Sequence, residues 1–292
     1  YTATYGSTVA QQPLGFGSSL GGSNDASGTT LGVPMTNVRA GSLIVVFLKW
    51  EGAAAGSTVT VSDGTSTFTA DPRVDAANGD LHGQFFYLPA STKSGNVTYT
   101  ATWSAARPWR RMLVTEYTYG GGTVVFDGSN RGTGTTSTLS SGNITTTGSD
   151  EVAFGAYGEY SASSTTNERI GNVVADQIVR EAFASMWSKR FTAPFTGAAT
   201  AAVTPASWVG GVIAFKHNAG PNTAPTITNI ADVTTSEDTA TAAIPFTIGD
   251  TETAATSLAV TATSSNPAVV AATGLVLGGS GASRTIAVTP VA

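Results

Sequence analysis

The chain has 292 residues, of which 41% are hydrophobic, 9% aromatic and only 11% charged. A chain of this length can bury a core, and this much apolar surface excludes a disordered polypeptide. The net charge of −5, with 14 Lys and Arg residues, leaves no basic surface for nucleic acid, and the absence of Cys excludes disulfides and thiol chemistry. The longest apolar run, residues 43–48, is far shorter than the ~20 residues of a membrane-spanning helix. We therefore expect neither a nucleic-acid partner nor a membrane span.

Short runs of β-branched and aromatic residues between Gly, Ser, Asn and Asp clusters predict an all-β sandwich. The predicted strands are residues 42–50, 57–62, 84–88, 96–103, 112–119, 122–127, 151–157, 198–204 and 208–216. The dipeptides Asp63-Gly64, Asn78-Gly79 and Asp127-Gly128 predict turns, the first of them within a hairpin. Residues 176–191 fit two strands better than a short helix.

The first residues of the chain alternate as a strand does and are followed by a Gly- and Ser-rich stretch up to residue 32. This pattern predicts an extended arm that adds a strand to an open sheet edge of another copy. Pairing of the arm within its own domain is the alternative. The arm residues named by this prediction are Tyr1, Thr2, Ala3, Thr4 and Tyr5.

Residues 218–224 are rich in Pro, Gly and Asn and separate two regions of different composition. Residues 1–217 form the first predicted domain, and residues 225–292 form the second. From residue 219 onward the chain has five acidic residues, one basic residue, Arg284, and one aromatic residue, Phe246. The second domain is therefore expected to be small, acidic and built on an aliphatic core.

Residues 225–292 resemble the tandem Ig-like or cadherin-like repeats of large bacterial surface proteins, most specifically at 229–240 and 248–255. Residues 1–217 resemble the jelly-roll or lectin-like modules that accompany such repeats, through 41–47, 61–69, 116–119 and 208–216. The resemblance implies a jelly-roll-like β-sandwich followed by a smaller Ig-like sandwich, in a secreted protein of a bacterial cell surface or matrix. The second module is short for the ~100 residues of an Ig-like sandwich and is expected to be incomplete.

Calcium is the one cofactor that the sequence indicates, because hard cations take oxygen ligands. In the first domain four such residues fall within ten positions of a loop, although ordinary loop residues are the alternative: Asp71, Asp75, Asn78 and Asp80. In the second domain the resemblance to cadherin-like repeats implies a calcium site near the module junction. The residues implied there are Glu237, Asp238, Asp250 and Glu252.

A cluster of aromatic and basic residues around residue 109 predicts contact with a carbohydrate or another partner. Aromatic rings pack against sugar rings, and polar groups bind at the edges. Trp109 follows a proline in a predicted loop, whereas burial with the arginine stems covering apolar surface is the alternative. The predicted contact residues are Trp109, Arg107, Arg110, Tyr117 and Tyr119.

Catalytic residues are not indicated. The chain has two histidines; His82 is expected in a solvated loop, and His217 lies at the domain boundary. Glu116 is the best carboxylate for glycoside hydrolysis, but that reaction needs a second carboxylate across the sugar. Pairing of Glu116 with Arg110 or Arg111 is the structural alternative.

We therefore expect a non-enzymatic protein that acts in adhesion or in self-assembly into a fibre, with other copies of itself or a glycan as partner. The alternative is a carbohydrate-binding module of a larger secreted glycan-acting protein. A hydrolase acting through Glu116 is the least favoured reading.

Overall fold

The computed structural model describes residues 14–53, 57–160, 165–218, 220, 223–250, 253 and 255–291. Their regular structure consists of antiparallel strands and two short 3₁₀ helices, so the predicted all-β sandwich class is confirmed. The chain divides into two compact units, one ending at Asn218 and the other beginning at Ala219.

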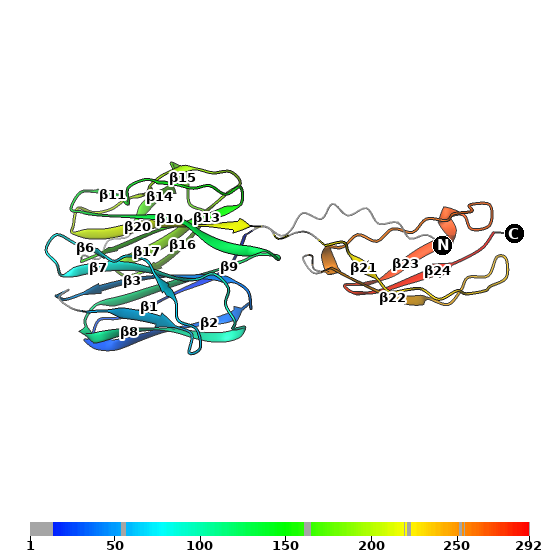
Figure 1. The fold of residues 1–292 in the computed structure, drawn as a ribbon, viewed down its shortest axis with the longest axis horizontal. Helices are drawn as coiled ribbons and strands as arrows, with labels where there is room; N and C mark the ends of the chain where they lie inside the picture. Colours follow the sequence, from blue (N-terminus) through cyan, green and yellow to red (C-terminus); the bar gives the residue numbers. More distant parts are fainter. Residues whose placement is uncertain are drawn as a thin grey trace. The chain divides into compact units, whose positions relative to one another are not determined.

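The first unit contains four layers of sheet (Figure 1). The first layer contains β2 (Gly28–Val38), β8 (Gly95–Arg107) and β4 (Val59–Ser62). The second contains, in order, β1 (Gly15–Asn24), β9 (Arg110–Thr118), β3 (Leu43–Glu51), β7 (Leu81–Leu88) and β5 (Thr69–Ala70), with β6 (Val74–Asp75) also paired to β7.

The third layer contains β10 (Thr123–Gly134), β20 (Trp208–Asn218), β13 (Glu151–Glu159), β17 (Ala184–Phe191) and β16 (Gln177–Glu181). The fourth contains β11 (Thr138–Ser140), β19 (Ala199–Ala202), β14 (Thr166–Ile170) and β15 (Val173–Val174). A separate strand pair is formed by β12 (Ile144–Thr145) and β18 (Thr196–Gly197).

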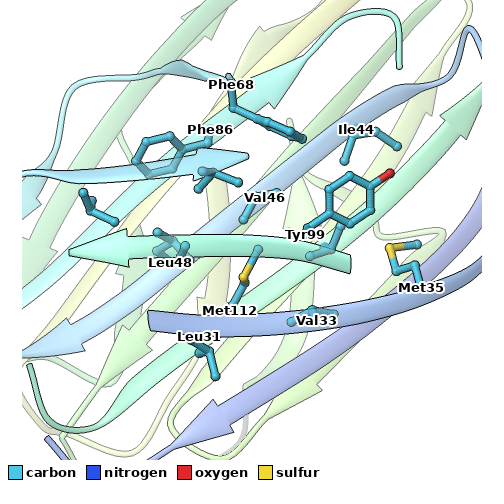
Figure 2. Close-up of a cluster of buried hydrophobic side chains, with 14 of the residues drawn as sticks. Leu31, Val33, Met35, Ile44, Val46, Leu48, Phe68, Phe86, Tyr99 and Met112 are labelled. Carbon is cyan, nitrogen blue, oxygen red and sulfur yellow. The ribbon is translucent and has the colours of Figure 1, made fainter. Parts of the chain in front are cut away.

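Strand β3 is buried on both faces, which explains its continuous apolar sequence. Successive side chains of a strand point to opposite faces, so Ile44, Val46 and Leu48 pack against the first layer (Figure 2). Val45 and Phe47 pack instead against the third layer. The second and third layers therefore form the centre of the unit.

The four layers form two sandwiches of the same topology. The five-stranded order β1-β9-β3-β7-β5 of the second layer is repeated by β10-β20-β13-β17-β16 in the third. The order β2-β8-β4 of the first layer is likewise repeated by β11-β19-β14 in the fourth. The sequence predicts one sandwich in this unit, and the structure contains two that pack through their larger sheets.

A β-bulge fixes which positions of the two sandwiches are equivalent. In β1 the bulge lies between Phe16, opposite Tyr117, and Ser18, opposite Glu116. In β10 it lies between Phe126, opposite Phe215, and Gly128. Asp127-Gly128 is therefore part of a bulge, and the predicted turn at this dipeptide is wrong. A Gly in either a turn or a bulge relieves backbone strain, so the dipeptide alone does not distinguish the two.

Other local predictions are confirmed. The hairpin around Asp63-Gly64 is closed by a bridge between Ser62 and Thr67. Residues 176–191 form the strands β16 and β17 rather than a helix.

The second unit has one four-stranded sheet in the order β21 (Thr226–Ile227), β22 (Ile244–Gly249), β24 (Ser283–Val288) and β23 (Leu275–Ser280). The two 3₁₀ helices, η1 (Ala255–Ser257) and η2 (Ala272–Gly274), belong to this unit. Phe246 and Ile286 of the sheet pack with Leu258 and Val270, which lie outside its strands, so irregular chain contributes to this core.

Candidate functional site

Two cations lie buried between the central sheets of the first unit. Lys49 of β3 and Arg111 of β9 are paired across neighbouring strands, and each is at most 1% exposed. The equivalent positions of the second sandwich, fixed by the bulge, are Gly158 and Val209, which also face each other. Because that sandwich has the same topology without either cation, the fold does not require a positive charge at this place. Buried charges without a structural requirement mark a candidate functional site.

Lys49 is held by one carboxylate and one aromatic ring. Its Nζ contacts Glu51 and lies 5.4 Å from the centre of the Phe183 ring. Burial lowers the pKa of Lys49, and nearby Arg111 acts in the same direction, whereas the hydrogen bond to Glu51 opposes them. A compact ammonium group is thus fixed between a carboxylate and an aromatic ring.

Arg111 uses all of its polar atoms. Its Nε donates to the Ala182 carbonyl oxygen at 2.6 Å, and Nη2 lies 2.7 Å from the Asp25 carboxylate. The guanidinium carbon is 4.9 Å from the centre of the Phe183 ring and 5.9 Å from that of Trp109. Arg111 therefore supports both rings through cation–π contacts.

Trp109 and Phe183 both have left-handed backbone conformations, with φ of 49° and 69°. Such angles are rare for bulky residues and cost about 1–3 kcal/mol each, so the surrounding contacts must hold them. The two rings meet edge to face at 5.8 Å. Trp109 is nevertheless 39% exposed. The sequence folds here into two strained turns that hold one indole ring at the surface.

Trp109, Phe183, Arg111 and Lys49 are called the Trp109 platform below. A rigid, exposed indole ring supported from within can pack against the apolar face of a ligand without a large loss of side-chain entropy. The half-exposed carboxylate of Asp25 lies at the margin of the platform. Stacking combined with a polar margin is suited to binding.

The other predicted contact residues lie in different environments. Arg107 is half-buried, and its Nε has no hydrogen-bond partner in the described part of the chain. Arg110 is buried, donates to the Thr30 and Ala26 carbonyl oxygens, and lies over the Trp103 ring. Arg110 therefore belongs to the interior, and its predicted surface contact is wrong.

The two tyrosines also pack inward. Tyr117 is 2% exposed and shares a hydrogen bond of 2.8 Å with Ser188, so its predicted ligand contact is wrong. Tyr119 is half-buried; its hydroxyl donates to the Pro89 carbonyl oxygen, and its ring lies against His217. Both tyrosines can pack inward because each hydroxyl group finds a hydrogen-bond partner from a distant part of the chain.

The predicted calcium ligands of the first domain do not converge. Asp71 accepts a hydrogen bond from Ser129 and lies near Arg131, whereas Asp75 pairs with Arg73 and His82. The side-chain amide of Asn78 donates to the Tyr160 hydroxyl. The backbone N–H of Asp80 donates to the side-chain oxygen of Asn78. The Asp71 and Asp75 carboxylates are therefore paired with basic side chains, and that of Asp71 also with a hydroxyl group.

In the second unit Glu237 and Asp238 are exposed, and Asp250 accepts a hydrogen bond from the Thr253 amide. Glu252 lies outside the described residues. Among the residues that the structure describes, no three His, Asp or Glu side chains are grouped as a metal site would require. Calcium binding that involves Glu252 stays a prediction.

His82 and Glu116 lie in environments that differ from those predicted from the sequence. His82 is fully buried in β7, where Nδ1 lies 2.7 Å from Asp75 and Nε2 lies 2.8 Å from the Gly52 carbonyl oxygen. Glu116 accepts hydrogen bonds from the Arg39 amide and the hydroxyl groups of Ser42 and Ser18, rather than pairing with an arginine. Both residues hold segments together within the first sandwich.

The second unit has a groove of about 550 Å³. It is lined mainly by hydroxyl side chains, together with Phe246 and Arg284. None of its lining residues belongs to a site that the sequence predicts. The predicted arm residues, Tyr1 to Tyr5, lie outside the described residues.

Lys49 and Phe183 are not among the residues that the sequence predicts for this site. The signal for Lys49 was present, because a Lys within the apolar run of β3 is unusual for a buried strand. Phe183 gave no comparable signal, since its role depends on a turn that packs against a strand more than 60 residues away.

No protein-family model, curated protein or solved structure matches this chain. No helix in the described residues is long and apolar enough to cross a membrane.

Proposed function

We propose that this protein is a non-enzymatic adhesive component of a bacterial cell surface or matrix and that the Trp109 platform binds carbohydrate. The observation that carries this proposal is the exposed indole ring of Trp109, fixed at φ 49° over Arg111 and Phe183. The resemblance of the sequence to bacterial surface modules supports the extracellular setting.

A sugar ring offers an apolar face of C–H groups and a rim of hydroxyl groups. The apolar face would pack on Trp109, and the rim would reach the Asp25 carboxylate and the Arg107 side chain. Because the ring is fixed before binding, little conformational entropy is lost when the ligand arrives. This chemistry needs no cofactor and no reacting group.

Retention of the protein in native gels that contain soluble polysaccharides tests the proposal. We expect at least one polysaccharide to retard the wild-type protein and Trp109→Ala to reduce that retardation at least about tenfold, equivalent to a loss of about 1.4 kcal/mol. Phe16→Ala is the matched control, because Phe16 is 40% exposed and lies outside the platform. Equal retardation of both variants and the wild type would contradict the proposal. So would the absence of retardation by every polysaccharide of a broad panel.

Self-assembly is a second candidate function, favoured by the edge strand β23. In the described structure β23 pairs only with β24, carries no charged residue, and exposes 60% of Val276. Natural edge strands usually contain charges or Pro that prevent pairing with other chains. We propose that β23 adds to a strand of a second copy.

Sedimentation and electron microscopy test this candidate. We expect concentration-dependent oligomers or filaments of the wild-type protein, and monomers for Val276→Lys, because a charge on the edge opposes pairing. Val233→Lys is the control, since Val233 is 52% exposed and lies outside the strands. A wild-type protein that stays monomeric at all concentrations would eliminate assembly and leave glycan binding untouched.

A further inference from the structure

Four buried N–H groups without a hydrogen-bond partner lie in the first sandwich. They are Trp50 Nε1, Trp103 Nε1, Arg107 Nε and Arg110 Nε, and no acceptor in the described residues receives a hydrogen bond from them. One other buried side-chain N–H group of the described chain is unpartnered, and it belongs to Arg284 of the second unit. Buried polar groups are nearly always hydrogen-bonded, so this concentration of unpartnered donors requires an explanation. None of the four residues belongs to the Trp109 platform.

Three of these residues lie side by side. Lys49 pairs with Arg111, so the next positions, Trp50 of β3 and Arg110 of β9, are neighbours that face the first layer. The Trp50 ring meets the ring of Trp103, which comes from β8 of that layer, edge to face at 6.1 Å. The Arg110 guanidinium carbon lies 5.7 Å from the centre of the Trp103 ring. Three unpartnered donors are therefore enclosed between the first and second layers.

Two further donors lie at the edge of this group. Arg107 pairs with Gly28 of β2, and Gly28 lies against Arg110, because a Cβ at Gly28 would be 2.8 Å from Arg110 Nη2. The Ser57 hydroxyl is also buried and unpartnered, and it lies two residues before β4, whose first residue pairs with Trp103. These five residues are called the inner donor cluster below.

Arg110 is a buried cation that no carboxylate balances in the described residues. It is 2% exposed and donates to the carbonyl oxygens of Thr30 and Ala26. The other two fully buried Lys and Arg side chains of this sandwich, Lys49 and Arg111, each contact a carboxylate. Buried charges are normally paired, so we expect a negative partner beside Arg110.

The second sandwich satisfies its buried indoles within the fold. Trp187 and Trp208 donate to the carbonyl oxygens of Arg169 and Thr136, each at 3.2 Å. Unpartnered indole N–H groups are therefore a property of the inner donor cluster and not of this type of sandwich.

We propose that the inner donor cluster binds one small monovalent anion of the halide class, such as chloride. Every unpartnered group in the cluster can donate a hydrogen bond, and an anion can accept from all of them. A water molecule must donate as well as accept, and apart from the Ser57 hydroxyl the cluster offers it no unpartnered side-chain acceptor. Trp50, Trp103 and Arg110 are each at most 2% exposed, so the occupant is small and enclosed. A ligand that stays partly in solvent, such as an acidic sugar, does not meet this condition.

The anion would fix the turn that carries Trp109. Arg107 and Arg110 flank Pro108 and Trp109 in the sequence, so one anion bound by both guanidinium groups holds both ends of the turn. The same anion would link β3, β8 and β9, which belong to two different layers. The anion site does not depend on carbohydrate binding, and each can be tested without the other.

Thermal unfolding of the full-length protein at constant ionic strength, with gluconate replaced stepwise by chloride, tests the proposal. We expect the melting temperature to rise with chloride and to reach a plateau, because an anion that binds only the folded state stabilises it. Trp103→Phe keeps an aromatic ring but loses the N–H group, so it should raise the half-saturating chloride concentration at least about fivefold. Trp187→Phe is the matched control, since it loses a similarly buried indole N–H group outside the cluster and should keep the wild-type chloride dependence.

A crystal of the wild-type protein grown in bromide provides a test that needs no variant. We expect an anomalous-scattering peak in hydrogen-bonding contact with the indole nitrogens of Trp50 and Trp103. A crystal without that peak overturns the proposal, because the donors then bind water alone. A chloride dependence without a plateau, or one that is unchanged in folded Trp103→Phe, also overturns it, because no anion then binds at this cluster.

Discussion

Several polar side chains inside the first unit pair with residues from distant parts of the chain, and this pairing explains why some residue-level predictions fail. The exposure of Trp109 agrees with the loop that the sequence predicts after Pro108. The buried Tyr117 hydroxyl shares a hydrogen bond with Ser188, which lies on a strand more than 70 residues later in the chain. A single sequence reveals local constraints such as the first, but partners that only the fold brings together remain hidden.

Asp71 gives a residue-scale prediction about pH. Burial raises the pKa of Asp71, against the hydrogen bond from Ser129 and the charge of Arg131. The folded protein therefore holds this proton more tightly than the unfolded chain does, and the contribution of Asp71 to the free energy of unfolding falls as pH rises above the ordinary aspartate pKa. Asp71→Asn has no proton to lose.

Urea unfolding of the wild-type protein and Asp71→Asn between pH 3.5 and 7 measures this effect. We expect the stability of the wild type relative to the variant to decrease as pH rises through this range. A relative stability that stays constant, or that grows with pH, would show that burial does not control this carboxyl group.

At the scale of elements, strand positions are predictable because period-2 alternation and turn residues are local properties. The strands around residues 43–50, 96–103 and 208–216 are present close to their predicted bounds. The sequence predicts a turn at the bulge of β10, because Asp-Gly suits either structure. Pairing partners and bulges depend on the neighbouring strand, so they could not be predicted from one segment.

Gly155 of β13 gives an element-scale prediction. A Cβ at this position would lie 2.4 Å from a ring atom of Trp187, which is fully buried on the neighbouring strand β17. We expect Gly155→Ala to lower the free energy of unfolding by about 1–3 kcal/mol, because an overpacked core must shift. Gly32→Ala on β2 is the control, since the nearest atom there is a Thr98 methyl group at 3.3 Å.

Thermal unfolding followed by circular dichroism compares these two variants with the wild type. The expected order of melting temperature is wild type and Gly32→Ala above Gly155→Ala. A Gly155→Ala variant as stable as the wild type would mean that Trp187 does not pack on β13 as described.

At the scale of the whole molecule, the first unit contains two sandwiches of the same topology that differ in chemistry at several equivalent positions. Equivalent pairs such as Phe16 and Phe126 keep the fold, whereas Lys49 and Gly158, or Gly17 and Asp127, differ in chemistry. The sequence alone does not reveal this repeat, because only the pairing of the strands shows which positions are equivalent. Comparison of equivalent positions singles out Lys49 and Arg111 of the Trp109 platform.

The central claim is that the first unit binds carbohydrate through an indole ring held at its surface. Hydroxyl-radical footprinting with mass spectrometry, with and without a polysaccharide that retards the protein in native gels, tests it most directly. We expect the bound polysaccharide to slow oxidation of Trp109 at least about fivefold and to leave Phe16, 40% exposed, unchanged. Unchanged oxidation of Trp109 in a protein that has bound polysaccharide would contradict the account.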